Sequence, residues 1–515
     1  MTGDLRLASR VAGVALLVLC GERVAAQCPD GSPPPCRPSR AAAAPVANSV
    51  AVLYFDNLSP DTADAYLADG LTEEITARLG ELPQLQIKRP SRDAVRRLRD
   101  TVPDYLVVLG RLLRVRYLVE GSVRRAGTQV RVSARLLGAG DGFRVWSAEY
   151  DRSAGDLLAL QGDLAQQVAT SIAGRLTPAD RAHLRARPTG NAEAYEHFLR
   201  GNYLLAQRNP ASAARAIEEY RRALHIDPAF GRALGRLAYT YGLFLQWGWE
   251  YPGIPSDSLL ARGLRAVADG LARDSTVSDT WMGLAYLRQA ENPRTLAGVA
   301  DAYERAVALD RFNAEALHQY GSALAQLGRD SQATAVLQHA LAIEPQRPVT
   351  LVELSYVADI NGRPREALRW ADSAVAMDPS FFFSFQQRGV VRLELGDSAG
   401  ARRDATTAIQ LGDVDYSHGV LALLDGASGD TASARARVER LRAAVKHPDR
   451  PTVFENSALA MALIGVGDTS GALTALEHAQ PRGLFLWYSL RAILNVAHLS
   501  PSPRLNRLIR ECQPP

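Results

Sequence analysis

The chain has 515 residues, of which 47% are hydrophobic and 22% are charged. This composition excludes a wholly disordered chain, and the length predicts two or more folded parts. The formal net charge of +4 is small for this size, and acidic and basic residues are interspersed through most of residues 191–480, so we expect no nucleic-acid partner.

Residues 1–26 have the features of an export signal. Two arginines, Arg6 and Arg10, precede an apolar run over residues 11–19, and small residues at 24–26 offer a cleavage site. The apolar run is too short to cross a bilayer as a helix. We therefore expect cleavage, export, no membrane span in the mature chain, and a periplasmic or envelope location.

The cysteines give two further expectations about the amino-terminal region. Cys20 offers lipid attachment as an alternative to simple cleavage, although Leu19 is bulkier than a lipoprotein signal requires. In an oxidising compartment Cys28 and Cys36 are candidates for a small disulfide loop. A metal site is the competing interpretation, but no nearby histidine or second cysteine pair completes a ligand set. Residues 27–48 are rich in Pro and Ala and predict a linker.

Residues 49–176 predict a compact α+β domain with a mostly antiparallel sheet. In chain order, the expected elements are a buried strand over 50–55, a helix over 63–79, a short strand over 85–87, a helix capped by Ser91, a hairpin of strands 116–123 and 129–136, a strand over 143–150, and a helix over 156–176. The hairpin has one wet face that bears arginines.

Three sequence blocks in this domain resemble a known family. Residues 52–59 read VLYFDNLS, residues 66–75 read YLADGLTEEI, and residues 117–123 read YLVEGSV. In their order and spacing they resemble the TolB-like amino-terminal domain of bacterial proteins with tetratricopeptide arrays. In that family the domain commonly follows an effector such as a winged helix, a kinase or a cyclase. Here a signal-like segment stands in that place, so the resemblance implies no effector activity in this chain.

A 34-residue step organises most of the remaining sequence. Pro345 and Pro379 are 34 residues apart, and so are Ala340 and Ala374. Each 34-residue segment contains two amphipathic helical patterns. Residues 191–480 predict about eight such units, of which 314–347 and 348–381 are the clearest, and residues 481–515 predict a terminal cap. The pattern resembles tetratricopeptide repeats, which implies an all-α superhelical solenoid.

The phase of the repeat identifies candidate binding residues. In such a solenoid the first helix of each unit lines the concave face, and its non-packing positions are offered to a peptide or protein partner. These positions are Asp279, Tyr286, Gln289, Glu315, His318, Ser322, Gln326, Tyr356, Asp359, Gln386 and Glu394. The alternative for each is a solvated helix face.

One repeat is stretched by an aromatic-rich segment. This candidate patch consists of Tyr241, Phe244, Trp247, Trp249 and Tyr251. Aromatic residues at this density are typical of interaction hot spots. The alternative is an insertion that packs back on the solenoid.

The sequence offers no set of catalytic residues. Histidines lack ligand spacing, no glycine-rich phosphate loop or serine elbow is present, and the adjacent carboxylates Glu73 and Glu74 are expected to be solvated helix charges. We expect no catalytic site, no cofactor and no metal. The predicted function is a non-enzymatic scaffold or adaptor of the bacterial envelope. The alternative is a regulatory or sensory subunit whose DNA-binding, kinase or cyclase effector acts in trans.

Overall fold

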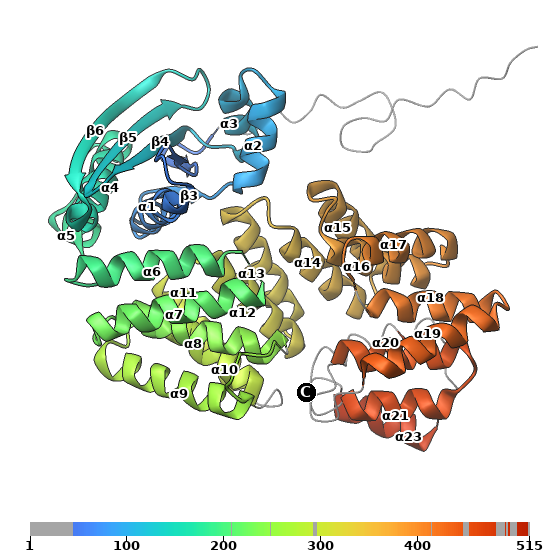
Figure 1. The fold of residues 1–515 in the computed structure, drawn as a ribbon. Helices are drawn as coiled ribbons and strands as arrows, with labels where there is room; N and C mark the ends of the chain where they lie inside the picture. The colour runs from blue at the N-terminus through green and yellow to red at the C-terminus, as the bar shows by residue number, and fades with distance from the viewer. Residues whose placement is uncertain are drawn as a thin grey trace, which may run out of the picture. The chain divides into compact units, whose positions relative to one another are not determined.

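The computed structural model describes residues 45–207, 209–247, 249–291, 296–413, 415–445, 453–479, 490, 493–494 and 502–512. The predicted signal segment, Cys20 and the predicted Cys28–Cys36 disulfide lie outside these residues, as does most of the predicted cap. Within the described part, an α+β domain leads into a series of paired helices (Figure 1). None of the described helices has the length and apolar character needed to cross a membrane.

The sheet of the α+β domain is mixed, whereas we expected it to be mostly antiparallel. Its strands are β1 (Ser49–Val52), β2 (Asp56–Asn57), β3 (Gln86–Lys88), β4 (Tyr117–Ala126), β5 (Gln129–Gly138) and β6 (Arg144–Ser153). Their order is β3-β1-β4-β5-β6, with β2 beside β4. β1 runs parallel to β3 and β4, and the hairpin β4–β5 and strand β6 are antiparallel. Helical crossovers separate β1, β3 and β4, and such connections return the chain in the same direction.

Helices cover the two faces of this sheet unequally. On one face, α1 (Ala65–Gly80) and α4 (Leu157–Ala173) contribute to the same core as the inward side chains of β4 and β5. On the other face, α2 (Arg92–Thr101) and α3 (Tyr105–Leu113) pack on β1 and the beginning of β4. The polar side chains of β5 and β6 on this second face are left exposed.

Two short helices of this region are absent from the sequence prediction. The sequence of α3 is YLVVLGRLL, which has few polar residues to mark a helical period. The helix α5 (Pro178–Arg185) begins with a capping box between Thr177 and Asp180. Pro178 marks the first turn of this helix as well as the end of the previous one, which is the position that proline tolerates best.

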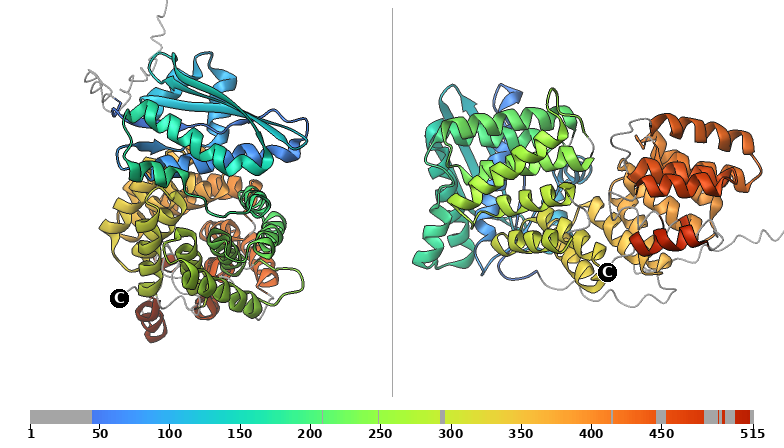
Figure 2. Two further views of the ribbon diagram at one scale, coloured as in Figure 1. Left: turned by 90° about the vertical axis from the view of Figure 1, so that its left-hand side faces the viewer. Right: turned by 90° about the horizontal axis from the view of Figure 1, so that it is seen from below.

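The helices of the solenoid form successive antiparallel pairs (Figures 1 and 2). They are α6 (Ala192–Leu205), α7 (Pro210–Ile226), α8 (Gly231–Trp247), α9 (Ser256–Arg273), α10 (Ser278–Glu291), α11 (Leu296–Leu309), α12 (Ala314–Gln326), α13 (Asp330–Ile343), α14 (Pro348–Ile360), α15 (Pro364–Met377), α16 (Phe382–Glu394), α17 (Ser398–Gln410), α18 (Tyr416–Ala427), α19 (Thr431–Ala444), α20 (Val453–Gly465) and α21 (Thr469–Ala479). A further helix, α23 (Pro503–Cys512), lies near the carboxyl end of the chain.

The 34-residue repeat of the sequence is the spacing between the first residues of successive inner helices. The first helices of four successive pairs, α12, α14, α16 and α18, begin 34 residues apart. Within these pairs, Gly328, Gly362 and Gly396 occupy the turn with φ of 69°, 68° and 82°. This left-handed conformation ends a helix at little cost only for glycine. The second helix then ends before Pro345 or Pro379, as the sequence predicts.

Candidate functional site

Most of the predicted groove residues are buried between neighbouring helices. The buried ones are Asp279, Tyr286, His318, Ser322, Gln326, Asp359 and Gln386. Gln289, Glu315, Tyr356 and Glu394 are half-buried. The structure therefore places these polar side chains largely at contacts within the solenoid, and a partner would reach the half-buried members first.

Glu315 is the centre of one such contact. Its carboxylate accepts hydrogen bonds from the hydroxyls of Tyr239 at 3.3 Å and Tyr286 at 3.1 Å, and it also pairs with Arg347. Arg347 pairs in turn with Glu344 at 2.8 Å. Three successive inner helices, α8, α10 and α12, are thereby joined through one carboxylate.

Glu74 links the α+β domain to the solenoid. This carboxylate of α1 lies 3.0 Å from Arg78 of the same helix and 2.8 Å from Arg232 of α8. Arg232 and Arg236 both pair with Asp279, the first predicted groove residue. Burial opposes ionisation of Glu74, but the two arginines outweigh it and hold its pKa below the ordinary value. Glu74 is thus a buried ion-pair partner, and the expectation of a solvated charge was wrong.

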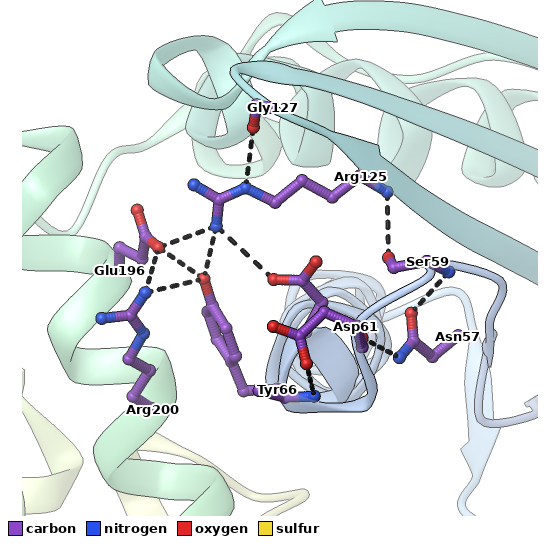
Figure 3. A network of polar contacts seen from close by, with 10 residues as sticks. Asn57, Ser59, Asp61, Tyr66, Arg125, Gly127, Glu196 and Arg200 are labelled. Carbon is purple, nitrogen blue, oxygen red and sulfur yellow. Dashed lines mark hydrogen bonds and ion pairs between the residues drawn. The ribbon is translucent and has the colours of Figure 1, made fainter.

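A second polar network connects α1 and β4 to α6, the first solenoid helix (Figure 3). Arg125 at the end of β4 donates to the hydroxyl of Tyr66 at 2.9 Å and to Glu196 of α6 at 3.0 Å. Glu196 also accepts from Tyr66 and, at 2.7 Å, from Arg200. The backbone N–H of Arg125 donates to Ser59 in the loop after β2. This loop is therefore held against β4, and both α1 and β4 are held against α6.

The aromatic segment packs partly on the solenoid. Tyr241 and Phe244 are buried, and the Phe244 ring lies 5.6 Å from Trp249 and 5.4 Å from Tyr251, between ring centroids. The Tyr251 hydroxyl donates to Glu218 of α7 at 2.7 Å. These contacts favour the packing alternative for the described side chains, and the side chain of Trp247 lies outside them.

The α+β domain contains a cleft of about 800 Å³ on the second, partly open face of its sheet. We call it the arginine cleft. It is lined by Leu53, Tyr54, Phe55, Asp56, Asn57, Leu58, Arg92, Val95, Arg96, Arg99, Tyr105, Glu120, Gly121, Ser122, Ser133, Ala134, Arg135, Arg144, Ser147, Ala148 and Glu149. These residues come from β2 and the residues on either side of it, from α2 and α3, and from β4, β5 and β6.

The wall and the floor of the arginine cleft have different chemistry. The wall is α2, which contributes Arg92, Arg96 and Arg99 at positions i, i+4 and i+7 of one helix face. The floor is the exposed polar row of the hairpin and β6, where Ser122 faces Ser133 and Ser133 faces Glu149 across the strands. Five arginines and three carboxylates line the cleft, so its lining has an excess of positive charge.

Several of these charges already have partners at the rim of the cleft. Arg92 pairs with Asp69 and stacks over the ring of Tyr54, with its guanidinium carbon 4.7 Å from the ring centroid. Arg99 lies 3.4 Å from Asp56. Burial, together with the nearby carboxylate of Glu73, raises the pKa of Tyr54 to about 12, so its hydroxyl stays protonated at neutral pH.

The arginine cleft is not visible in the sequence as one site. The sequence predicts one part of it, the arginine-bearing face of the hairpin, and the arginines spaced along the helix after Ser91 are a second signal that could have pointed to it. The hairpin and this helix are brought together by the pairing of strands that are far apart in the sequence. Such pairing cannot be predicted from local periodicity. Among the described residues, no group of three His, Cys, Asp or Glu side chains is arranged to hold a metal ion.

Comparison with known proteins finds a repeat family that matches one segment of the chain and a protein that is related to part of it. The model of the family described as "Tetratricopeptide repeat" matches residues 314–347. A protein of Rhizobium meliloti (strain 1021) named "Putative adenylate cyclase 3" is 32% identical over 194 residues, which cover 38% of this chain and 32% of that protein. The chain thus spans about a third of the length of this relative.

Several solved structures resemble parts of the chain. PilF of Pseudomonas aeruginosa is 19% identical and covers 42% of this chain and 95% of its own, with a TM-score of 0.34. YrrB, described as a TPR protein with an unusual peptide-binding site, is 18% identical and covers 38% and 92%, with a TM-score of 0.27. A tetratricopeptide repeat protein of Parabacteroides merdae ATCC 43184 is 13% identical and covers 53% and 99%, with a TM-score of 0.38. We draw no functional conclusion from these likenesses. The chain is mostly helical, with a small amino-terminal sheet, and it contains a tetratricopeptide repeat at residues 314–347.

Proposed function

We propose that this chain is a non-enzymatic interaction scaffold of the bacterial envelope, with a TolB-like α+β domain followed by a tetratricopeptide solenoid. The observation that carries the proposal is the matched repeat at residues 314–347, together with helix pairs that continue it in the same 34-residue phase. Tetratricopeptide repeats are in general protein-interaction modules. The signal-like residues 1–26 support export, and the three sequence blocks of residues 49–176 support the TolB-like assignment.

The partner is expected on the inner helices beyond the α+β domain. Tyr356 of α14 and Glu394 of α16 are the half-buried predicted groove positions that lie farthest from the α+β domain along the chain. A peptide or protein segment with donors for Glu394 and apolar surface for Tyr356 fits these two side chains.

An affinity pull-down from bacterial envelope extract tests the proposal. The full chain is compared with a Tyr356→Ala, Glu394→Arg variant and with Arg369→Ala, which changes an exposed residue of the outer helix α15. We expect a specific protein, identified by mass spectrometry, that is recovered with the unchanged chain and with Arg369→Ala but at least about tenfold less with the groove variant. Equal recovery with all three proteins contradicts the proposed surface.

The location of the chain is tested by cell fractionation. Expressed at full length in a bacterial host, the chain is expected in the envelope fraction, with its amino terminus shortened by cleavage near residue 26. Accumulation of the uncleaved chain in the cytoplasm contradicts an envelope role.

A second function has one observation in its favour. The 32% identity to a protein named as an adenylate cyclase is compatible with a regulatory or sensory subunit whose effector acts in trans. Under this alternative, the pull-down recovers a protein with a cyclase, kinase or DNA-binding domain. Recovery of envelope proteins alone favours the scaffold.

A further inference from the structure

We propose that the arginine cleft of the α+β domain binds a small molecule that carries a phosphate group. This inference goes beyond the protein-binding role proposed for the solenoid and does not depend on it. All residues that line the cleft belong to the α+β domain.

The arginine cleft lies where the connections between the parallel strands change from one face of the sheet to the other. β1 stands between β3 and β4, and all three strands are parallel. The crossover from β1 to β3 passes through α1 on one face, whereas the crossover from β3 to β4 passes through α2 and α3 on the other. The chain therefore leaves the carboxyl ends of the neighbouring strands β1 and β3 toward opposite faces of the sheet. Residues 53–58, which follow β1, and α2, which follows β3, both line the cleft. In open α/β sheets this switch point is where ligands bind.

The wall of the cleft presents several guanidinium groups to one volume. Arg92, Arg96 and Arg99 share one face of α2, while Arg135 and Arg144 reach the cleft from β5 and β6. A guanidinium has five N–H donors in a fixed fork, which match the oxygens of a phosphate better than a single ammonium does. Several guanidinium groups that line one cleft favour a ligand group with several oxygens and more than one negative charge.

The ion pairs of Arg99 and Arg135 leave part of each guanidinium available. Arg99 and Asp56 approach to 3.4 Å with both side chains about half-exposed, and such exposed pairs contribute little free energy. Arg135 pairs with Glu120 at 2.6 Å; the Glu120 side chain is 14% exposed, but that of Arg135 is 58% exposed. Since a guanidinium has five N–H donors, Arg135 can keep this pair and still donate to a phosphate.

Serine hydroxyls on the floor of the cleft and two tyrosine rings complete the features of a ligand site. The hydroxyls of Ser122 and Ser133, opposite each other on neighbouring strands, are donors that suit phosphate oxygens. Tyr54 and Tyr105 line the same cleft and offer apolar surface. The volume of about 800 Å³ lies within the range of small-molecule sites. The best fit is thus a phosphate ester with an apolar or aromatic part, about the size of a nucleotide.

Isothermal titration of the full chain with inorganic pyrophosphate and with ADP tests this proposal. The double variant Arg96→Ala, Arg99→Ala removes two wall guanidiniums. Arg97→Ala is the matched control, because Arg97 is an exposed arginine of the same helix that does not line the cleft. We expect the unchanged chain and the control to bind at least one probe with the same Kd, and the double variant to bind it at least about tenfold more weakly.

A variant that strengthens binding separates a lost site from a damaged fold. Glu149→Gln removes a carboxylate from the floor of the cleft and is expected to tighten binding of the same probe about twofold to fivefold. The proposal is overturned if neither probe binds at millimolar concentration, if Arg97→Ala loses affinity as the double variant does, or if Glu149→Gln weakens binding.

Discussion

Carboxylates buried among the helices differ in the partners they have. Glu74 is buried and Glu344 is half-buried, but nearby arginines outweigh the loss of solvation and hold the pKa of each below its ordinary value. Glu353 of α14 is 8% exposed and has the hydroxyl of Ser322 as its hydrogen-bonding partner. Burial therefore dominates and raises the pKa of Glu353 to about 7. This side chain is neutral in the folded protein over much of the mildly acidic range.

The raised pKa of Glu353 predicts a defined pH dependence of stability. Between pH 4.5, the ordinary value, and about 7, the folded state keeps a proton that the unfolded state has lost. The contribution of Glu353 to the free energy of unfolding therefore falls as pH rises through this window, by about 3 kcal/mol in total. Glu353→Gln is neutral at every pH, so we expect it to be more stable than the unchanged chain at pH 8, with the difference shrinking toward pH 5. Urea unfolding at both pH values measures this.

The control for this prediction is Glu366→Gln. Glu366 lies on the outer helix α15 and pairs with Arg363 at 2.6 Å near the surface. Its replacement is expected to change the free energy of unfolding by less than about 1 kcal/mol, with no gain at pH 8. If Glu353→Gln has the same effect at pH 5 and pH 8, the carboxylate of Glu353 ionises with an ordinary pKa and the assignment is wrong.

Among the elements, two pairs of inner helices approach unusually closely through glycine. In α8 and α10 the contact involves Gly235, Gly242 and Gly283, and in α18 and α20 it involves Gly419, Gly426 and Gly465. A Cβ added at Gly235 would lie 2.5 Å from backbone atoms of Asp279 and Thr280. The first of these contacts involves the repeat that the aromatic-rich segment stretches. The glycines there permit close contact between backbones, which a pattern of apolar positions does not report.

Gly235→Ala is expected to destabilise the protein. The added methyl group meets backbone atoms of α10, which cannot move aside by rotating a side chain, so the helices must separate at a cost of about 1–3 kcal/mol. Gly298→Ala is the matched control in α11, where an added Cβ meets only the end of Arg288, at 3.6 Å. There the substitution is expected to be neutral or to stabilise by up to about 1 kcal/mol. Chemical unfolding monitored by circular dichroism compares the two, and equal losses would contradict the steric explanation.

The elements that the sequence predicts well are those fixed by local signals. The capping side chain of Ser91, the hairpin β4–β5 and the helix pairs from α12 onward follow from periodicity, caps and turns. The parallel pairing of β1 with β3 and β4 depends on contacts between distant segments, and so does the convergence of Arg92 and Arg135 on one cleft. The repeat phase identified inner-helix positions such as Glu315, but it did not report their ion pairs with neighbouring segments, such as the pair of Glu315 with Arg347 just before α14.

At the scale of the whole molecule, the α+β domain and the first repeats share one hydrophobic core. This core includes Val50 of β1, Leu71 of α1, Phe198 of α6 and Ala323 of α12. The contact also brings Gly80 of α1 against the ring of Phe312, where an added Cβ would lie 2.9 Å from the ring. A separate core is formed by helices α16 to α23. These are the two largest clusters of the described chain, and smaller clusters in helices α12 to α16 lie between them, so the division falls inside the solenoid.

These two cores predict two unfolding units that do not coincide with the sequence domains. Leu71→Ala and Leu476→Ala remove the same atoms from fully buried sites in the first and the second core, and each is expected to cost about 2–5 kcal/mol. Native-state hydrogen exchange at rising denaturant concentration locates the loss. Leu71→Ala is expected to speed exchange in α1, α4, α6 and α8 together and to leave α20 and α21 unchanged, because a shared core loses its packing as a whole.

Leu476→Ala is expected to give the opposite pattern. Exchange accelerates in α20 and α21, which contribute to the second core, while α1 and α6 keep their protection. If Leu71→Ala exposes α1 and α4 but leaves α6 and α8 protected, the α+β domain unfolds alone and the shared core does not couple it to the solenoid. If both variants accelerate exchange everywhere, the small clusters between α12 and α16 transmit stability along the whole repeat array, as nearest-neighbour coupling in a solenoid allows.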